Sequence, residues 1–195
     1  MAQPLRLFIA IDLPPDVKQL LGDVQGALQR HTHTVRWADP DGTHLTLKFL
    51  GAVEAEAVER IVGGLAAVAA RHQPFVLQTD RLGVFPNQQR PRIVWLGLRG
   101  DVAALEQVQQ DVERTIAPLG FPTEARPFRP HLTLGRSDKE AQGEDFRTIR
   151  QAVTATDVPR SAAITVNELV LMHSELSAQG ARYTPIAHGR LDGAR

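Results

Sequence analysis

The chain has 195 residues, of which 43% are apolar, enough to bury the core of one large domain or of two small lobes. Its 22 basic and 22 acidic residues give a formal net charge of zero, so any RNA contact must come from a local basic patch rather than from bulk charge. The absence of cysteine excludes disulfides, thiolate metal sites and cysteine nucleophiles.

The N-terminal half predicts strands alternating with amphipathic helices. Residues 5–12 are apolar and β-branched, as expected for a buried strand, but this run is too short for a signal peptide or a membrane span. We therefore expect a cytoplasmic protein without a membrane partner. Further on, the sequence predicts a helix from Pro14 onward, extended segments at 35–37 and 44–50, a helix at 54–71 and a strand at 75–82.

The C-terminal half repeats this order after a predicted polar, proline-containing loop at residues 83–91. A strand at 92–98 precedes a helix at 102–116, which Gly100 and Asp101 cap and which ends at 118–120. The remaining predicted elements are an extended segment around 131–134, a polar helix at about 144–153, and a hairpin that pairs 164–172 with 182–187.

One tetrapeptide, His-Leu-Thr-Leu, occurs in both halves, at residues 44–47 and 131–134 (131 − 44 = 87). The first strands share nearly the same offset, because Arg6 and Arg92 lie 86 positions apart. An offset shared by several elements indicates an internal duplication. We therefore predict an α+β fold with two sheets and a cleft, formed by a single bilobal domain over 1–195 from repeat halves at about 5–82 and 91–188. Because one chain builds the cleft, a monomer is the default expectation.

The doubled motif has the chemistry of proton transfer beside a phosphate. Side chains two apart on a strand share a face, so each histidine accompanies a threonine hydroxyl. Two imidazoles on opposite sides of a phosphorus atom can act as base and acid, since the histidine pKa of about 6.5 populates both forms near neutrality. Metal binding is the competing interpretation, but no Asp or Glu accompanies either tetrapeptide at ligand spacing. We therefore expect no metal site.

The chain resembles the two-histidine phosphoesterase superfamily, and within it the RNA 2′,3′-cyclic phosphodiesterases, also named 2′-5′ RNA ligases (ThpR or LigT-like). This resemblance implies two pseudo-symmetric lobes, each an antiparallel sheet with helices on its outer side, around a positively lined groove that carries both motifs. It also implies that hydrolysis needs no cofactor. The matching segments run in order along the chain: 6–11, Trp37, 44–51, 91–97, 130–136, Leu171, Ser174, Gly180 and Tyr183.

The resemblance also assigns roles to the motif residues. It implies that His44 is the proton donor to the departing ribose 3′ oxygen, and that His131 is the proton acceptor that activates water. Thr46 and Thr133 would then hold the non-bridging phosphate oxygens, and Arg136 would stabilise the developing charge. The expected substrate is RNA with a 2′,3′-cyclic phosphate end, for example a tRNA fragment, and the product is a 2′-phosphomonoester.

Strand parity adds one residue and leaves others undecided. Lys48 lies four positions after His44 and is expected on the same face as a phosphate contact, whereas Phe49 has the opposite parity and is expected in the core. His173 could face either the groove or the exterior.

Other functions remain open at this stage. Reversal of hydrolysis would give 2′-5′ ligation. The chain could also be a non-catalytic module that binds RNA ends, or a phosphoesterase acting on another nucleotide-derived cyclic phosphate. Histidine in both halves favours catalysis, because binding alone would tolerate arginine or lysine at these positions.

Overall fold

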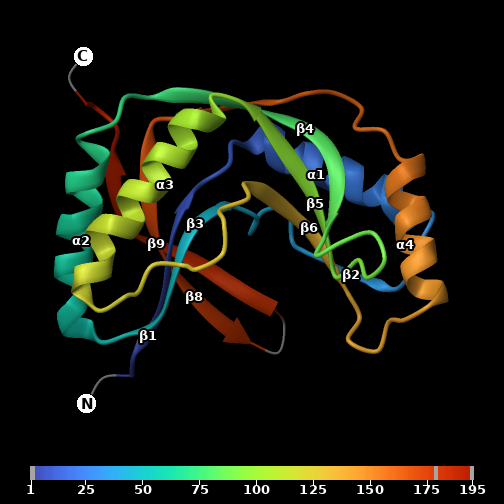
Figure 1. The fold of residues 1–195 in the computed structure, drawn as a ribbon, viewed down its shortest axis with the longest axis horizontal. Helices are drawn as coiled ribbons and strands as arrows, with labels where there is room; N and C mark the ends of the chain where they lie inside the picture. Colours follow the sequence, from blue (N-terminus) through green and yellow to red (C-terminus); the bar gives the residue numbers. More distant parts are fainter. Residues whose placement is uncertain (1–2, 178–179, 194–195) are drawn as a thin grey trace.

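The computed structural model describes residues 3–177 and 180–193 and folds them into two antiparallel sheets with flanking helices (Figure 1). Sheet A contains, in spatial order, β3 (Leu45–Val53), β1 (Leu5–Ile11), β8 (Glu168–Ser177) and β9 (Gly180–Arg190). Sheet B contains β2 (Val35–Trp37), β6 (His131–Ser137), β5 (Ile93–Gly100), β4 (Phe75–Phe85) and β7 (Ala163–Val166). The predicted α+β class with two sheets is confirmed.

Each sheet takes strands from both halves of the sequence. β1 and β3 belong to sheet A, but β2, which lies between them in the chain, pairs with β6 in sheet B. In the same way β4 follows the first motif and joins sheet B, whereas β8 and β9 follow the second motif and join sheet A. The repeated halves of the sequence are therefore not the two sheets of the molecule.

The helices are exchanged between the sheets as well. They are α1 (Pro15–Gln29), α2 (Ala55–Ala69), α3 (Val102–Ile116) and α4 (Glu144–Ala155), with a short 3-10 turn, η1 (Ala117–Leu119). Helices α2 and α3 pack on each other and on sheet A, although α3 follows a strand of sheet B. Helix α1 follows β1 of sheet A but lies against sheet B (Figure 1), where Gln25 donates a hydrogen bond to the Leu134 carbonyl of β6. No helix within 3–177 and 180–193 is long and apolar enough to cross a membrane.

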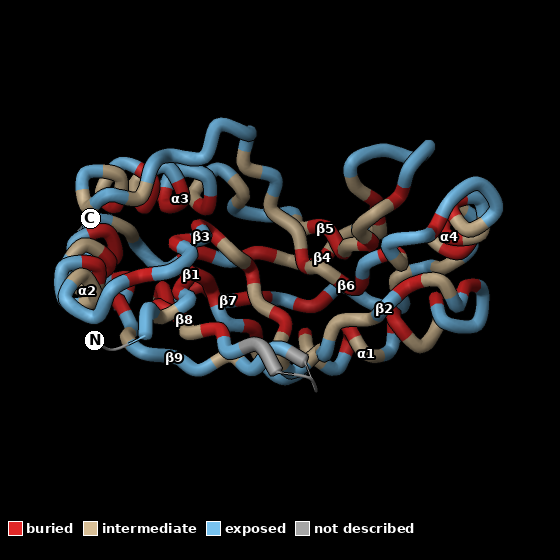
Figure 2. The backbone as a smooth tube through the Cα atoms, turned by 90° about the horizontal axis from the view of Figure 1, so that it is seen from below, coloured by how far each residue is buried: buried red, intermediate tan, exposed pale blue. Residues whose placement is uncertain are grey.

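β1, an inner strand of sheet A, is buried on both of its faces. The helices cover one face of the sheet, and the opposite face is called the second face below. Leu7, Ile9 and Ile11 belong to the main core that the helices cover. The side chains between them point the other way, as strand alternation requires. They form a small second cluster composed of Phe8, Ala10, Val170 and Met172, against which Tyr183 packs. Buried residues follow the strands of both sheets (Figure 2).

The structure corrects two of the predicted elements. β4 continues to Phe85, so the predicted loop at 83–91 begins three residues later. Position 83, inside this strand, requires glycine because a Cβ there would be only 2.2 Å from Cζ2 of Trp95, which crosses over it. The predicted strand at 164–172 is in fact two strands, β7 and β8, which belong to different sheets and are separated at Asn167.

Candidate active site

His44 lies immediately before β3, on the second face of sheet A. Its Nδ1 donates a hydrogen bond of 3.0 Å to the carbonyl oxygen of Gly42. Because a carbonyl can only accept, this contact places a proton on Nδ1 and leaves Nε2 available for chemistry. The ring stacks on Phe8 at 4.4 Å between centroids and meets the edge of Tyr183 at 4.9 Å. Three strands, β3, β1 and β9, therefore hold this imidazole in place.

His131 opens β6 and is held in the same way on sheet B. Its Nδ1 donates to the carbonyl oxygen of Arg129 at 2.7 Å, again two residues earlier in the chain. Phe85 of β4 presents a ring perpendicular to the imidazole at 5.0 Å. Each half of the molecule thus supplies one imidazole that is fixed through Nδ1 and supported by an aromatic ring, with Nε2 left for a substrate.

The two histidines have neighbours of opposite charge. Burial lowers the pKa of both imidazoles below the usual value, and the hydrogen bond to the preceding carbonyl partly restores each pKa. The Asp12 carboxylate further raises the pKa of His44, although Lys18 opposes it, whereas the Arg136 guanidinium further lowers the pKa of His131. The surrounding charges therefore favour a proton on His44 relative to His131.

The motif threonines lie on the same faces as their histidines. Thr46 pairs across the sheet with Ala10, and Thr133 pairs with Trp95. Directly opposed residues of antiparallel strands project to the same face. Ala10 belongs to the second face of sheet A, so Thr46 is on the side of His44.

A β-bulge interrupts both motif strands at equivalent leucines. In β3, Thr46 opposes Ala10 and Lys48 opposes Ile9, so Leu47 is the extra residue. In β6, Thr133 opposes Trp95 and Gly135 opposes Val94, which makes Leu134 the extra residue. A bulge shifts the alternation of side chains by one position. The residue three positions after each threonine therefore returns to the face of the histidine.

That residue is Phe49 in β3 and Arg136 in β6. Phe49 opposes Phe8, and Arg136 opposes Ile93, which is two residues from Trp95 on the same face of β5. This register and the effect of its charge on the pKa of His131 place Arg136 on the side of the second histidine, and its role in stabilising charge on the phosphate stays a prediction. Phe49, expected in the core, is 69% exposed instead.

The prediction for Lys48 is wrong for the same reason. The bulge at Leu47 turns Lys48 to the helix-covered face, where it is 5% exposed. Its Nζ lies 2.5 Å from Oε2 of Glu113 on α3 and donates to the Pro122 carbonyl at 2.8 Å. Lys48 is thus committed to a buried ion pair rather than to a phosphate. His173 opposes Leu7 across β8 and β1, so it projects to the face of sheet A opposite His44.

Sequence reasoning missed Arg36. β2 places it directly opposite Arg136 on β6, while the neighbouring Val35 is buried in the main core on the other face. The Arg36 side chain is largely exposed, and its Nε lies 3.5 Å from Oδ1 of Asp138. Two like charges opposite each other weaken a sheet unless an anion lies between them. The alternation of 35–37 could have shown that Arg36 points outward, but the sequence does not reveal the pairing partner of so short a strand.

The short segment between β2 and β3 connects the two sheets, because β2 pairs with the motif strand β6 and β3 is the other motif strand. The Ala38 amide, just after β2, donates to the Leu134 carbonyl of β6. The chain then turns compactly, with the Thr43 hydroxyl donating to the Asp39 carbonyl at 2.9 Å, and reaches His44. The first motif is therefore anchored one turn away from the strand that carries the second.

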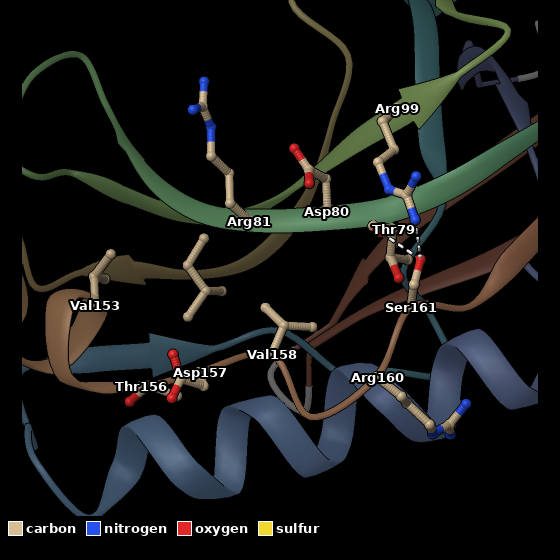
Figure 3. A pocket seen from close by; sticks show the side chains of 11 residues that line it. Thr79, Asp80, Arg81, Arg99, Val153, Thr156, Asp157, Val158, Arg160 and Ser161 are labelled. Carbon is tan, nitrogen blue, oxygen red and sulfur yellow. Dashed lines mark hydrogen bonds between the residues drawn. The ribbon is translucent and has the colours of Figure 1, made fainter.

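The pocket shown in Figure 3 is separate from both motifs. It has a volume of about 390 Å³ and is lined by residues of β4, by Arg99 of β5, by Val153 of α4 and by the segment after α4, with neither motif histidine among them. Two of its guanidinium groups already have partners, because Arg99 donates to Ser161 and Arg160 donates to the Asp16 carbonyl. We therefore locate the candidate site at the motifs and not in this cavity. Among the described residues, no group of three or more His, Asp or Glu side chains could hold a metal ion.

Known proteins resemble this chain over nearly its whole length. Residues 14–178 match the 2′-5′ RNA ligase superfamily. An RNA 2′,3′-cyclic phosphodiesterase of Escherichia coli is 34% identical over 190 residues, which are 95% of this chain and 96% of that protein. A protein of the same name from Geobacillus stearothermophilus is 33% identical over 96% of this chain, which spans only 57% of that longer relative. The crystal structure of E. coli LigT complexed with 3′-AMP superposes with a TM-score of 0.75 at 30% identity, covering 96% of this chain and 98% of LigT.

Proposed function

The chain belongs to the 2′-5′ RNA ligase superfamily, and we propose that it is an RNA 2′,3′-cyclic phosphodiesterase that opens terminal cyclic phosphates to 2′-phosphomonoesters. The observation that carries this proposal is the matched pair of imidazoles, each fixed through Nδ1 to the carbonyl two residues earlier. Such a pair suits a reaction that needs one base and one acid on either side of a phosphorus atom.

In the proposed reaction His131 acts as the base. Its Nε2 accepts a proton from a water molecule, whose oxygen forms a bond to phosphorus. The bond from phosphorus to the ribose 3′ oxygen breaks, and His44 donates a proton from Nε2 to that oxygen. One water is added, the phosphate remains on the 2′ oxygen, and the two histidines regain their starting protonation states through solvent.

The charges around each histidine support this division of roles. Burial lowers the pKa of both histidines, but the Asp12 carboxylate, partly opposed by Lys18, favours the protonated form of His44, whereas the Arg136 guanidinium favours the neutral form of His131. This difference in charge supports the two roles without using the resemblance to known proteins.

We assign the phosphate oxygens to Thr46, Thr133 and Arg136. The hydroxyls share a face with their histidines, and Arg136 lies one step further along the same face of β6. Arg36 is directly opposite Arg136 and largely exposed, and it joins Arg136 in binding the anionic phosphate beside its ion pair with Asp138. Lys48 has no part in this site.

We further propose that the protein acts as a monomer on RNA ends such as tRNA fragments in the cytoplasm, and that the reverse reaction can form a 2′-5′ linkage. Support for the monomer comes from the site itself, since one chain supplies both histidines and the residues that orient them. Light scattering during gel filtration would test this, because a dimer at micromolar concentration would contradict it.

The function is tested by incubating the protein with a short RNA that ends in a 2′,3′-cyclic phosphate, with a chelator present. Phosphorus NMR should show a 2′-phosphomonoester. We expect His44→Ala and His131→Ala each to lower kcat by at least about 100-fold, the usual contribution of a proton-transfer group. His33→Ala is the matched control, because His33 is exposed and outside both motifs.

Three results would contradict the proposal. A 3′-phosphate product would reverse the assigned leaving group. Tight binding without any product would indicate a module that binds RNA ends. Turnover of small nucleoside cyclic phosphates but not of RNA would indicate a different substrate.

A further inference from the structure

A buried glutamine supports the β-bulge of the second motif strand. Gln25 on α1 is 4% exposed, and its side-chain amide donates to the carbonyl of Leu134 at 2.9 Å and to the carbonyl of Ala38 at 2.8 Å. Leu134 is the extra residue of the bulge in β6, and Ala38 directly follows β2, which pairs with β6. One side chain therefore joins the two strands that carry Arg36 and Arg136.

The amide of Gln25 completes a pairing that the bulge interrupts. In a regular antiparallel ladder, two facing residues can exchange both of their backbone hydrogen bonds. Here the Ala38 amide donates to the Leu134 carbonyl at 2.9 Å, but the bond to the Ala38 carbonyl comes from Gln25. A bulge leaves its extra residue outside the regular ladder, and a buried carbonyl without a donor is costly. Gln25 therefore stabilises the bulged form of β6.

The first motif strand has support of the same kind. Gln109 on α3 is 7% exposed, and its amide lies 3.5 Å from the carbonyl of Leu47, the extra residue of the bulge in β3. The same amide also donates to Glu113 at 3.2 Å, so it is shared. Each of the two helices thus places a buried glutamine amide against the bulge of the sheet on which it packs. Amide support of the bulge is therefore common to both motif strands.

The bulge in β6 decides whether a cation reaches the second histidine. Simple alternation would place Gly135 on the face of His131, whereas the bulge brings Arg136 to that face. The Arg136 guanidinium lowers the pKa of His131, which shows that the two side chains interact. The cation on the adjacent strand, Arg36, has a carboxylate partner in Asp138 at 3.5 Å. Support of the bulge is therefore also support of the charge beside His131.

We propose that Gln25 is a positioning residue of the active site, whose amide holds the bulge at Leu134 and thereby keeps Arg136 on the face of His131. This inference rests on the proposed function, which assigns Arg136 to the substrate phosphate. Gln25 belongs to the buried face of α1 and acts through backbone carbonyls, so it does not itself touch the substrate.

The test replaces Gln25 with methionine and follows the histidines by NMR. Methionine has about the same length as glutamine but donates no hydrogen bond. We expect Gln25→Met to raise the pKa of His131, because Arg136 is no longer held beside it, and to leave the pKa of His44 unchanged. The imidazole C–H resonances, assigned by their loss in His44→Ala and His131→Ala, report both pKa values without turnover. With cyclic-phosphate RNA as substrate, kcat should fall about tenfold, since a small misplacement of a charged group is enough for such a loss.

A double substitution tests whether Gln25 acts through Arg136. Arg136→Gln alone should raise the pKa of His131, because it removes the cation. Adding Gln25→Met to Arg136→Gln should then raise this pKa no further and lower kcat no further, since residues that act through one another are not additive.

Two further variants separate positioning from general stability. Gln109→Met removes the same group beneath the other bulge and should leave the pKa of His131 unchanged, because the residue that follows that bulge, Phe49, carries no charge. Val24→Ala creates a cavity beside Gln25 on α1 and lowers stability without removing either hydrogen bond. It should leave both the pKa of His131 and kcat of the folded protein unchanged.

Two outcomes would overturn the positioning role. The first is an unchanged pKa of His131 in folded Gln25→Met, and the second is a further rise of this pKa when Gln25→Met is added to Arg136→Gln. If Gln25→Met does not fold, Gln25→Asn makes the same test, because its shorter side chain cannot bridge both carbonyls. Absence of hydrolysis by the unchanged protein would instead contradict the proposed function, with the NMR titration still deciding the role of Gln25.

Discussion

At the scale of single residues, the main feature is that two chemically identical side chains are given different surroundings. Both imidazoles are fixed through Nδ1 to a backbone carbonyl, so hydrogen bonding does not distinguish them. Their charged neighbours do, because Asp12 is near His44 and Arg136 is near His131. The acid and the base of the proposed reaction thus share the same hydrogen bond and differ in their charged neighbours.

This difference predicts how the pH dependence of kcat/KM responds to substitution. Burial lowers both pKa values, so we expect the bell-shaped profile to have its maximum below the ordinary histidine value of about 6.5. Asp12 raises the pKa of His44, so in Asp12→Asn the acid loses its proton at lower pH and the basic limb moves to lower pH. Arg136 lowers the pKa of His131, so in Arg136→Gln the acidic limb moves to higher pH.

The control for these shifts is Asp16→Asn, which removes an exposed carboxylate from the first turn of α1 and should leave both limbs in place. Profiles would be measured with the same RNA at constant ionic strength. A shift of the acidic limb in Asp12→Asn would contradict the assignment of His44 as the acid. A shift of the basic limb in Arg136→Gln would contradict the assignment of His131 as the base.

At the scale of elements, the bulges at Leu47 and Leu134 decide which side chains reach the site. Without them, simple alternation would place Lys48 beside His44 and bury Phe49. With them, Lys48 enters the space beneath α3 and pairs with Glu113, and Phe49 emerges beside Phe8. A sequence pattern of alternate residues cannot reveal a bulge, since the extra residue is apolar like its neighbour. This is why the expectation for Lys48 failed while those for the histidines and threonines, which precede the bulge, did not depend on it.

The buried ion pair predicts that Lys48 contributes to stability. Lys48→Ala would leave the Glu113 carboxylate without its cation, and we expect it to lower the free energy of unfolding by about 3–5 kcal/mol, measured by urea denaturation. Replacing both partners, with Lys48→Met and Glu113→Gln, should recover much of this loss. For folded Lys48→Ala protein, KM should be unchanged. A raised KM together with normal stability would indicate that Lys48 contacts the phosphate after all.

The helices were the most predictable elements because their apolar residues recur at the helical period and each packs on a single sheet. For example, the sequence at 102–116 predicts an apolar helix face of Val102, Leu105, Val108, Val112 and Ile116, and α3 buries all of them except Val102, which is partly buried. The strands were harder to predict. Their existence follows from local pattern, but their ends and partners depend on contacts with distant residues, as Gly83 beneath Trp95 shows.

At the scale of the whole molecule, the duplicated tetrapeptide predicted two related sheets, each with one motif, and the structure has this arrangement. The exchange of strands between the halves was not predictable, because pairing of β2 with β6 or of β8 with β1 leaves no local trace in the sequence. The same holds for the site. Residues next to the motifs could be identified, whereas Arg36 and Tyr183 reach it from β2 and β9, far from the motif beside which each lies.

The strand exchange has a consequence for the integrity of the chain. A cut between Gln89 and Arg90, in an exposed turn, would yield one fragment with β1 to β4 and another with β5 to β9, and neither could complete a sheet alone. We expect each fragment to lack cooperative unfolding by circular dichroism, and a mixture of the two to regain both folded structure and hydrolysis of cyclic-phosphate RNA. Cooperative unfolding of either fragment in isolation would contradict this. The repeat is thus visible in the sequence but is not an independent folding unit. We expect the two halves to fold only together, because each completes the sheets of the other, and we expect the covalent bond between them to be dispensable.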